Sequence, residues 1–244
     1  MIRNQRRLGV GLALGLFGAL AACDSDSGSS DPLPQDYYDG NESAALGSAT
    51  NEATCATCHG NTANAEGLPG NTLHNIAYHT GFKGSTDLTL LDGANACVTG
   101  WMGGTALTEG DNAWKLLEEY IQSISDTSVT TMNSIQPEVL ADLQAYEDKY
   151  GSGGDATAGA SAYAQSCARC HSGGLTVNAA GAPTRTTLAL LSAGEIAQQV
   201  RTAGPPPDTG ADTTDTRQGP MPFFEVSDLS EQELKDIIAF IKGT

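Results

Sequence analysis

The chain has 244 residues, with 12 lysines and arginines against 29 aspartates and glutamates, and its formal charge is −17. This balance excludes a nucleic-acid-binding protein, because too few cations are present to neutralise a phosphate backbone. Only 6% of the residues are aromatic, and there are 29 glycines and 10 prolines, so bulky side chains for a large conventional core are scarce. We therefore expect a bound group to help fill the centre of each folded part.

Residues 1–22 have the features of an export signal. A basic start with three arginines precedes an apolar run over 8–22 that is too short to span a membrane. The small residues directly before Cys23 resemble the lipobox of bacterial lipoproteins; the alternative is an ordinary signal peptide with an incidental Cys23. The resemblance implies lipidation of Cys23 and a protein anchored to a membrane in the periplasm of a Gram-negative bacterium. Removal of residues 1–22 takes away three cations and no acid, which leaves a charge of −20.

The next segments divide the chain by composition. Residues 23–43 are polar and acidic, which predicts a flexible tether. A first folded domain is expected over 44–126, a linker with a short helix over 127–153, and a second folded domain over 154–244.

The first domain and the linker each carry one clear helix signal. An apolar stripe predicts a closing helix over 111–124, and its members are Trp114, Leu117, Ile121 and Ile124. In the linker, Pro137 is suited to the first position of a helix that ends near Gly151.

The second domain begins and ends with predicted helices. Asp155 opens a helix that leads to Cys167. At the other end, Ser230 and Glu233 have the spacing of a capping box. The apolar stripe of this last helix consists of Leu234, Ile237, Ile238 and Ile241.

A five-residue motif, Cys-x-x-Cys-His, occurs twice. Its first copy is Cys55, Cys58 and His59, and its second copy is Cys167, Cys170 and His171. A lone Cys-x-x-Cys is compatible with a redox pair or half a zinc site, but neither explains the adjacent histidines. The pattern is the attachment signature of haem c. Residues i, i+3 and i+4 share one helix face, so two thiols can bond the porphyrin while the imidazole ligates the iron.

The second domain resembles a class I cytochrome c domain over its whole length. The resemblance rests on the motif, on Pro183 twelve residues after His171, and on the string Gly-Pro-Met-Pro-Phe around Met221. It implies an all-α fold of two tandem cytochrome c-like domains, each wrapped around a covalently bound haem c. It also implies that the Pro183 carbonyl orients the His171 ring and that Met221 is the second axial ligand; the alternative for Met221 is a core methionine.

The first domain repeats this plan less closely. Pro69 and Gly70 are similar to the turn that follows the haem motif in the family. Alignment of the two closing helices places Met102 within one residue of Met221, which favours Met102 as the second ligand of this haem. The other candidates are Cys97, His74 and His79, whereas Met132 lies beyond the closing helix.

Two classes of function follow from these assignments. The first is an electron carrier, not an enzyme, which exchanges electrons with other redox proteins through two His/Met haems. The negative charge of the chain predicts that these partners have a basic docking face. The second is a dihaem oxidoreductase of the thiosulfate dehydrogenase type, because Cys97 and Met102 resemble a Cys-x-x-x-x-Met stretch of that group, in which the cysteine ligates a haem. The simpler interpretation of Cys97 is a small buried hydrophobic residue.

Overall fold

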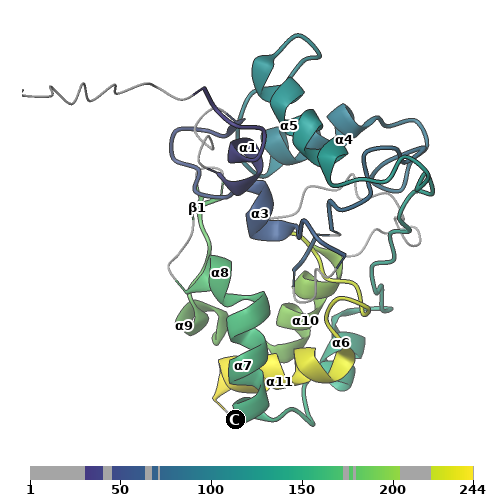
Figure 1. The fold of residues 1–244 in the computed structure, drawn as a ribbon. Helices are drawn as coiled ribbons and strands as arrows, with labels where there is room; N and C mark the ends of the chain where they lie inside the picture. The colour runs from purple at the N-terminus through teal and green to yellow at the C-terminus, as the bar shows by residue number, and fades with distance from the viewer. Residues whose placement is uncertain are drawn as a thin grey trace, which may run out of the picture. The chain divides into compact units, whose positions relative to one another are not determined.

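The computed structural model describes residues 31–40, 46–63, 68–70, 72–172, 176–177, 180–203 and 221–243. The chain separates into two compact units, 1–31 and 32–244, and the fold below is that of the second unit (Figure 1). The predicted signal peptide, Cys23 and the first part of the tether lie outside the described residues. No helix in the described part is long and apolar enough to cross a lipid bilayer.

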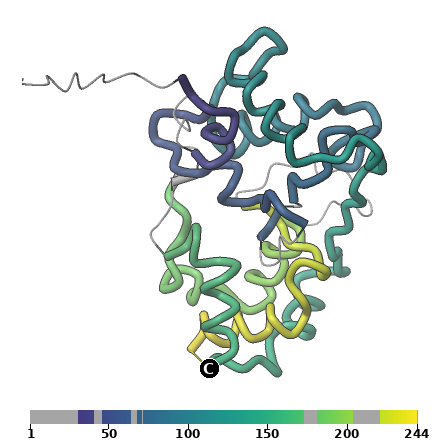
Figure 2. Tube along the Cα trace, viewed as in Figure 1, coloured from purple at the N-terminus to yellow at the C-terminus, as the bar shows by residue number. Residues whose placement is uncertain are grey.

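The described elements are almost entirely helical, as the sequence predicts. The helices are α1 (Asp36–Asp39), α3 (Cys55–Cys58), α4 (Leu90–Gly100), α5 (Asn112–Ser123), α6 (Leu143–Tyr150), α7 (Ala156–Ser166), α8 (Ala168–His171), α9 (Arg185–Leu188), α10 (Ala193–Thr202) and α11 (Glu231–Lys242). The only described strands are β1 (Thr176–Val177) and β2 (Ala180–Gly181), which form a two-residue antiparallel ladder. The Cα trace in Figure 2 shows how loops connect these short helices.

Two separate hydrophobic clusters organise this unit. The cluster in the first half is built mainly on α1, α4 and α5, and its buried members are Tyr37, Tyr38, Leu46, Ile76, Val98, Met102, Leu107, Trp114, Leu117, Tyr120 and Ile121. Helix α5 begins after Asp111 and ends before Ile124, so the predicted closing helix is confirmed. Its predicted stripe turns inward because an amphipathic helix gains most from burying its apolar face.

Helix α1 corrects the predicted tether over 23–43. Tyr37 and Tyr38 are buried, and the Tyr38 ring packs on that of Tyr120, with 5.1 Å between the ring centroids. The two tyrosine rings bury a large apolar area, although acidic residues lie on both sides of them in the sequence. The packed part of the first half therefore begins before residue 44.

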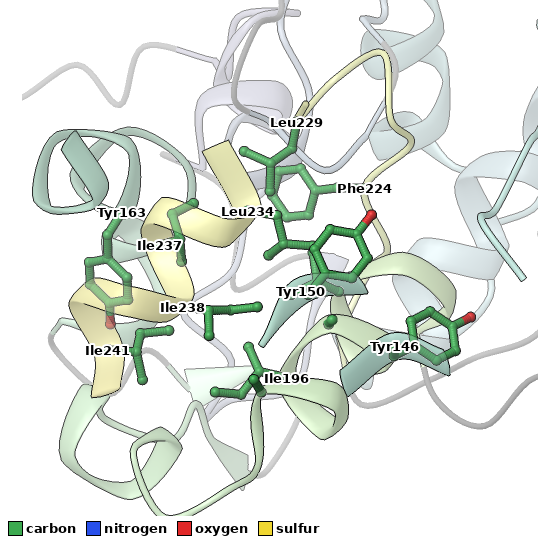
Figure 3. Close-up of a cluster of buried hydrophobic side chains, with 13 residues drawn as sticks. Tyr146, Tyr150, Tyr163, Ile196, Phe224, Leu229, Leu234, Ile237, Ile238 and Ile241 are labelled. Atoms are coloured by element: carbon green, nitrogen blue, oxygen red, sulfur yellow. The ribbon is translucent and has the colours of Figure 1, made fainter. Parts of the chain in front are cut away.

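The cluster in the second half is built on α6, α7, α10 and α11 (Figure 3). Helix α7 packs along α11, and α10 packs along α6. Asp155 caps α7 through hydrogen bonds from the backbone N–H groups of Thr157 and Ala158. Ser230 and Glu233 form the predicted capping box at the start of α11. Both caps are local signals, which is why the sequence reveals these helices.

Helix α6 differs from the predicted linker helix in its start and in its role. It begins after Asp142, whose side chain accepts a hydrogen bond from the Ala145 N–H, and not at Pro137; it ends before Gly151 as predicted. Tyr146 and Tyr150 on this helix are almost fully buried in the second cluster. The helix is therefore part of the second half's packing, and the division at 153/154 cuts through that core.

Candidate haem sites

The first Cys-x-x-Cys-His motif lies on the one-turn helix α3. Thr54 and Thr57 form a capping box at its start, and the Thr54 N–H donates to the Thr57 hydroxyl over 3.0 Å. The His59 N–H donates to the Cys55 carbonyl oxygen over 2.9 Å. This turn brings both thiols and the imidazole to one side of the helix, as the attachment chemistry requires.

Both thiols and the imidazole line a cavity of about 210 Å³. Met102 and Cys97 line the same cavity, and so do His79 and Met132. His74 is not among the described residues that surround it. The structure thus brings the motif together with the predicted ligand Met102 and with two of its three competitors, Cys97 and His79.

Met102 is placed by the C-terminal end of α4. Its side chain is 4% exposed, and its N–H donates to the Cys97 carbonyl oxygen over 3.0 Å. Its own carbonyl oxygen accepts from the Ser48 N–H over 2.9 Å. These two backbone bonds hold the residue where its thioether faces the cavity, which favours the ligand assignment but also suits a core methionine.

Gly70 lies against the His59 ring. A Cβ atom at Gly70 would overlap the Nδ1 and Cε1 atoms of that ring and would lie 2.9 Å from the Cys58 carbonyl oxygen. The Gly70 N–H donates to the same carbonyl oxygen over 2.9 Å. Only glycine at position 70 allows the His59 ring to occupy this position. The sequence predicts that Gly70 belongs to a turn, but it does not reveal the contact with the ring.

A second contact to the motif comes from α1. The Tyr38 hydroxyl donates to the His59 carbonyl oxygen over 2.7 Å. Burial raises the pKa of Tyr38 to about 12, so the hydroxyl stays protonated and remains a donor. The sequence analysis misses this residue because it lies in the stretch assigned to the tether.

The thiols of both motifs are in surroundings that disfavour the thiolate. Burial raises the pKa of Cys55 and of Cys167 to about 12, and it also raises the pKa values of Cys58 and Cys170. A zinc site would need thiolates. Within the described ranges, no three His, Cys, Asp or Glu side chains are grouped so that they could hold a metal ion.

The second motif connects α7 to α8. Cys167 ends α7, and the His171 N–H donates to the Cys167 carbonyl oxygen over 2.9 Å. The Nδ1 atom of His171 lies 2.6 Å from the Pro183 carbonyl oxygen, which confirms the contact that the family resemblance implies. A carbonyl acceptor at Nδ1 fixes the tautomer and leaves Nε2 for a metal.

Met221 is half-buried and packs against the second hydrophobic cluster, as does Cys167. Residues 204–220, which precede it, lie outside the described residues. The segment after it is anchored to α10, because the Phe224 N–H donates to the Val200 carbonyl oxygen over 2.7 Å. The buried Arg201 side chain donates from Nη1 to the Phe224 carbonyl oxygen over 3.2 Å. Nothing in the sequence distinguishes Arg201 from the other arginines as the anchor.

The residues at both motifs fit haem c. Each motif supplies two partly buried thiols and an imidazole, and the first motif opens on a cavity lined mainly by apolar side chains. Gly70 at the first imidazole and the Pro183 carbonyl at the second are the kind of neighbours that set the orientation of a ligating ring.

Residues 154–241 match the family of cytochrome c oxidase, cbb3-type, subunit III. No curated protein matches the chain. The match covers the second motif, its Pro183 contact and Met221, so this part of the chain is similar to a c-type cytochrome domain. A domain of this class carries covalently bound haem c and transfers electrons.

Proposed function

We propose that the chain is a dihaem c-type cytochrome with two tandem cytochrome c-like domains, which carries electrons between redox proteins. The observation that carries the proposal is the cavity at the first motif, where the Cys55 and Cys58 thiols, the His59 imidazole and Met102 meet. The first half lies outside the family match, so the haem site of the first half rests on this cavity and on the repeated motif.

The roles of the residues follow from their chemistry. Haem c, when bound, accepts and releases single electrons. Cys55 and Cys58 in the first half, and Cys167 and Cys170 in the second, would hold it covalently, with His59 and His171 as iron ligands. Met102 and Met221 would supply the sixth ligands, and a thioether favours ferrous iron and raises the potential. With both iron faces occupied by side chains, no position is left for a substrate, which favours a carrier.

The alternative is a dihaem oxidoreductase of the thiosulfate dehydrogenase type in which Cys97 ligates the first haem. One observation favours it: Cys97 lines the same cavity as Met102 and lies near enough to Cys55 to influence its pKa. A thiolate ligand would lower the potential of that haem and would suit sulfur chemistry.

Low-temperature EPR combined with near-infrared magnetic circular dichroism on the oxidised protein separates the two functions. The carrier predicts two His/Met haems. Replacing Cys97 by alanine should then leave both signatures unchanged, and Met102→Ala should abolish one of them. A His/Cys signature that disappears in Cys97→Ala would establish the alternative and contradict the carrier.

We also propose that the protein is lipid-anchored through Cys23 in the periplasm of a Gram-negative bacterium. The support is the export signal over 1–22 with the small residues before Cys23, and the attachment of haem c outside the cytoplasm is consistent with it. Fractionation tests the anchor: Cys23→Ala should move the protein from washed membranes to the soluble periplasmic fraction, and retention in the membranes would contradict it.

A further inference from the structure

The cavity at the first motif has walls from both halves of the chain. Most lining residues belong to the first half, but Pro222, Phe223, Glu225 and Asp228 also line it. These four residues follow directly after Met221, the candidate ligand of the second haem. One short segment therefore contributes to both candidate sites.

Buried hydrogen bonds hold this segment in place. Arg201 is fully buried, and its Nη1 donates to the carbonyl oxygens of Phe224 and Glu225 over 3.2 and 3.1 Å. Its Nε lies 3.1 Å from the Tyr150 hydroxyl and 3.5 Å from a Glu138 carboxylate oxygen. Displacing a buried guanidinium from two backbone carbonyls and a carboxylate is costly, so these contacts hold the segment against α10.

Two further contacts lie close to this wall. The Gln136 N–H, on the stretch that leads from the first half to the second, donates to the Glu225 carboxylate over 2.9 Å. The Arg169 side chain, between the cysteines of the second motif, donates to the Ala56 carbonyl oxygen, between the cysteines of the first. The first contact holds the wall to the connecting stretch, and the second joins the two motifs directly.

We propose that four residues of the second half complete the haem site of the first half and set the reduction potential of that haem: Pro222, Phe223, Glu225 and Asp228. The inference rests on the proposed function. Phe223 would exclude water from the haem face or edge it contacts, and the carboxylates of Glu225 and Asp228 would favour the ferric state, because a nearby negative charge stabilises the more positive iron. A cavity with few polar atoms screens this effect less than water does.

Adjacent phenylalanines provide a matched pair of variants. Phe223 lines the cavity, whereas Phe224 is buried in the second hydrophobic cluster. In a redox titration followed by EPR, Phe223→Leu should shift the potential and the g-values of the first haem, and Phe224→Leu should leave both unchanged. The second haem is identified as the one that Met221→Ala alters.

A charge variant tests the same wall without removing apolar volume. Asp228→Asn should raise the potential of the first haem at low ionic strength. Burial raises the pKa of Asp228, so the titration is run at pH 8 to favour the ionised carboxylate. Glu119→Gln is the control, because Glu119 is exposed on α5 and is absent from the described lining, while the change in net charge is the same.

The haem count separates failure of this inference from failure of the proposed function. Two haems per chain, with a first haem that neither Phe223→Leu nor Asp228→Asn shifts, would overturn the inference alone. An equal shift in Glu119→Gln would overturn it too, since the effect would then be one of net charge. One haem per chain in the unmodified protein would overturn the proposed function and this inference together.

Discussion

The Nδ1 atom of His171 lies 2.6 Å from the Pro183 carbonyl oxygen, twelve residues further along the chain. This contact fixes the orientation of one imidazole by a hydrogen-bond acceptor. At the first motif, Gly70 lies against the Nδ1 side of the His59 ring and leaves no room for a side chain. A backbone acceptor thus contacts the second imidazole, and a glycine packs closely against the first.

Gly70→Ala should displace the His59 ring, because the added Cβ would overlap it and approach the Cys58 carbonyl oxygen to 2.9 Å. We expect a severalfold drop in the fraction of chains that carry a haem on the first motif, measured by intact-protein mass spectrometry. Gly110→Ala is the control, since a Cβ at Gly110 meets only the Thr108 hydroxyl oxygen, at 3.6 Å. Equal haem loading in both variants would show that the Gly70 contact does not position the ring.

Met221→Ala should leave haem attached at Cys167 and Cys170 but lower its potential sharply, because the thioether that favours ferrous iron is lost. The vacated coordination position should bind carbon monoxide. Optical titration of the reduced protein with carbon monoxide measures this directly. Met132→Ala should leave this haem unchanged, since Met132 lines the cavity of the first motif. A Met221→Ala spectrum like that of the unmodified protein would place the ligand elsewhere.

Gly159→Ala should destabilise the second half. A Cβ at Gly159 would overlap the Asp236 carbonyl oxygen and lie 2.9 Å from the Phe240 Cβ, where α7 crosses α11. Alanine gains about 1 kcal/mol in helix propensity, but overpacking costs about 1–3 kcal/mol, so the net change is a loss. Denaturant unfolding monitors it, with the exposed Ser161→Ala on the same helix as control. A Gly159→Ala midpoint at or above that of the control would refute the close packing.

The sequence reveals those parts of the fold that depend on local signals. Helices α5, α7 and α11 begin at residues that the sequence indicates, since their caps and stripes lie within the helices themselves. Helix α1 is missed because Tyr38 is stabilised by Tyr120 and by the His59 carbonyl, both distant in sequence. The cavity wall at Phe223 is missed for the same reason, because its neighbours at the first motif are more than 100 residues away.

The acidic surface predicts how ionic strength affects electron transfer. Without residues 1–22 the chain has a charge of −20, and opposite charges speed the encounter of two proteins until salt screens them. Transfer to a basic soluble cytochrome should slow as the Debye length falls from about 10 Å at 0.1 M salt to about 3 Å at 1 M. Stopped-flow measurements with a basic and an acidic partner check this, and the acidic partner should show the reverse trend. A flat profile with both partners would show that charge does not guide docking.

The number of haems per chain tests the central claim most directly. Pyridine haemochrome absorbance relative to protein mass, together with the intact mass of the chain, gives this number. The account predicts two covalently bound haems in the unmodified protein. It predicts one in a variant with both Cys55 and Cys58 replaced by serine, and one in the corresponding Cys167 and Cys170 variant. A single haem in the unmodified protein, retained when Cys55 and Cys58 are replaced, would contradict the dihaem assignment.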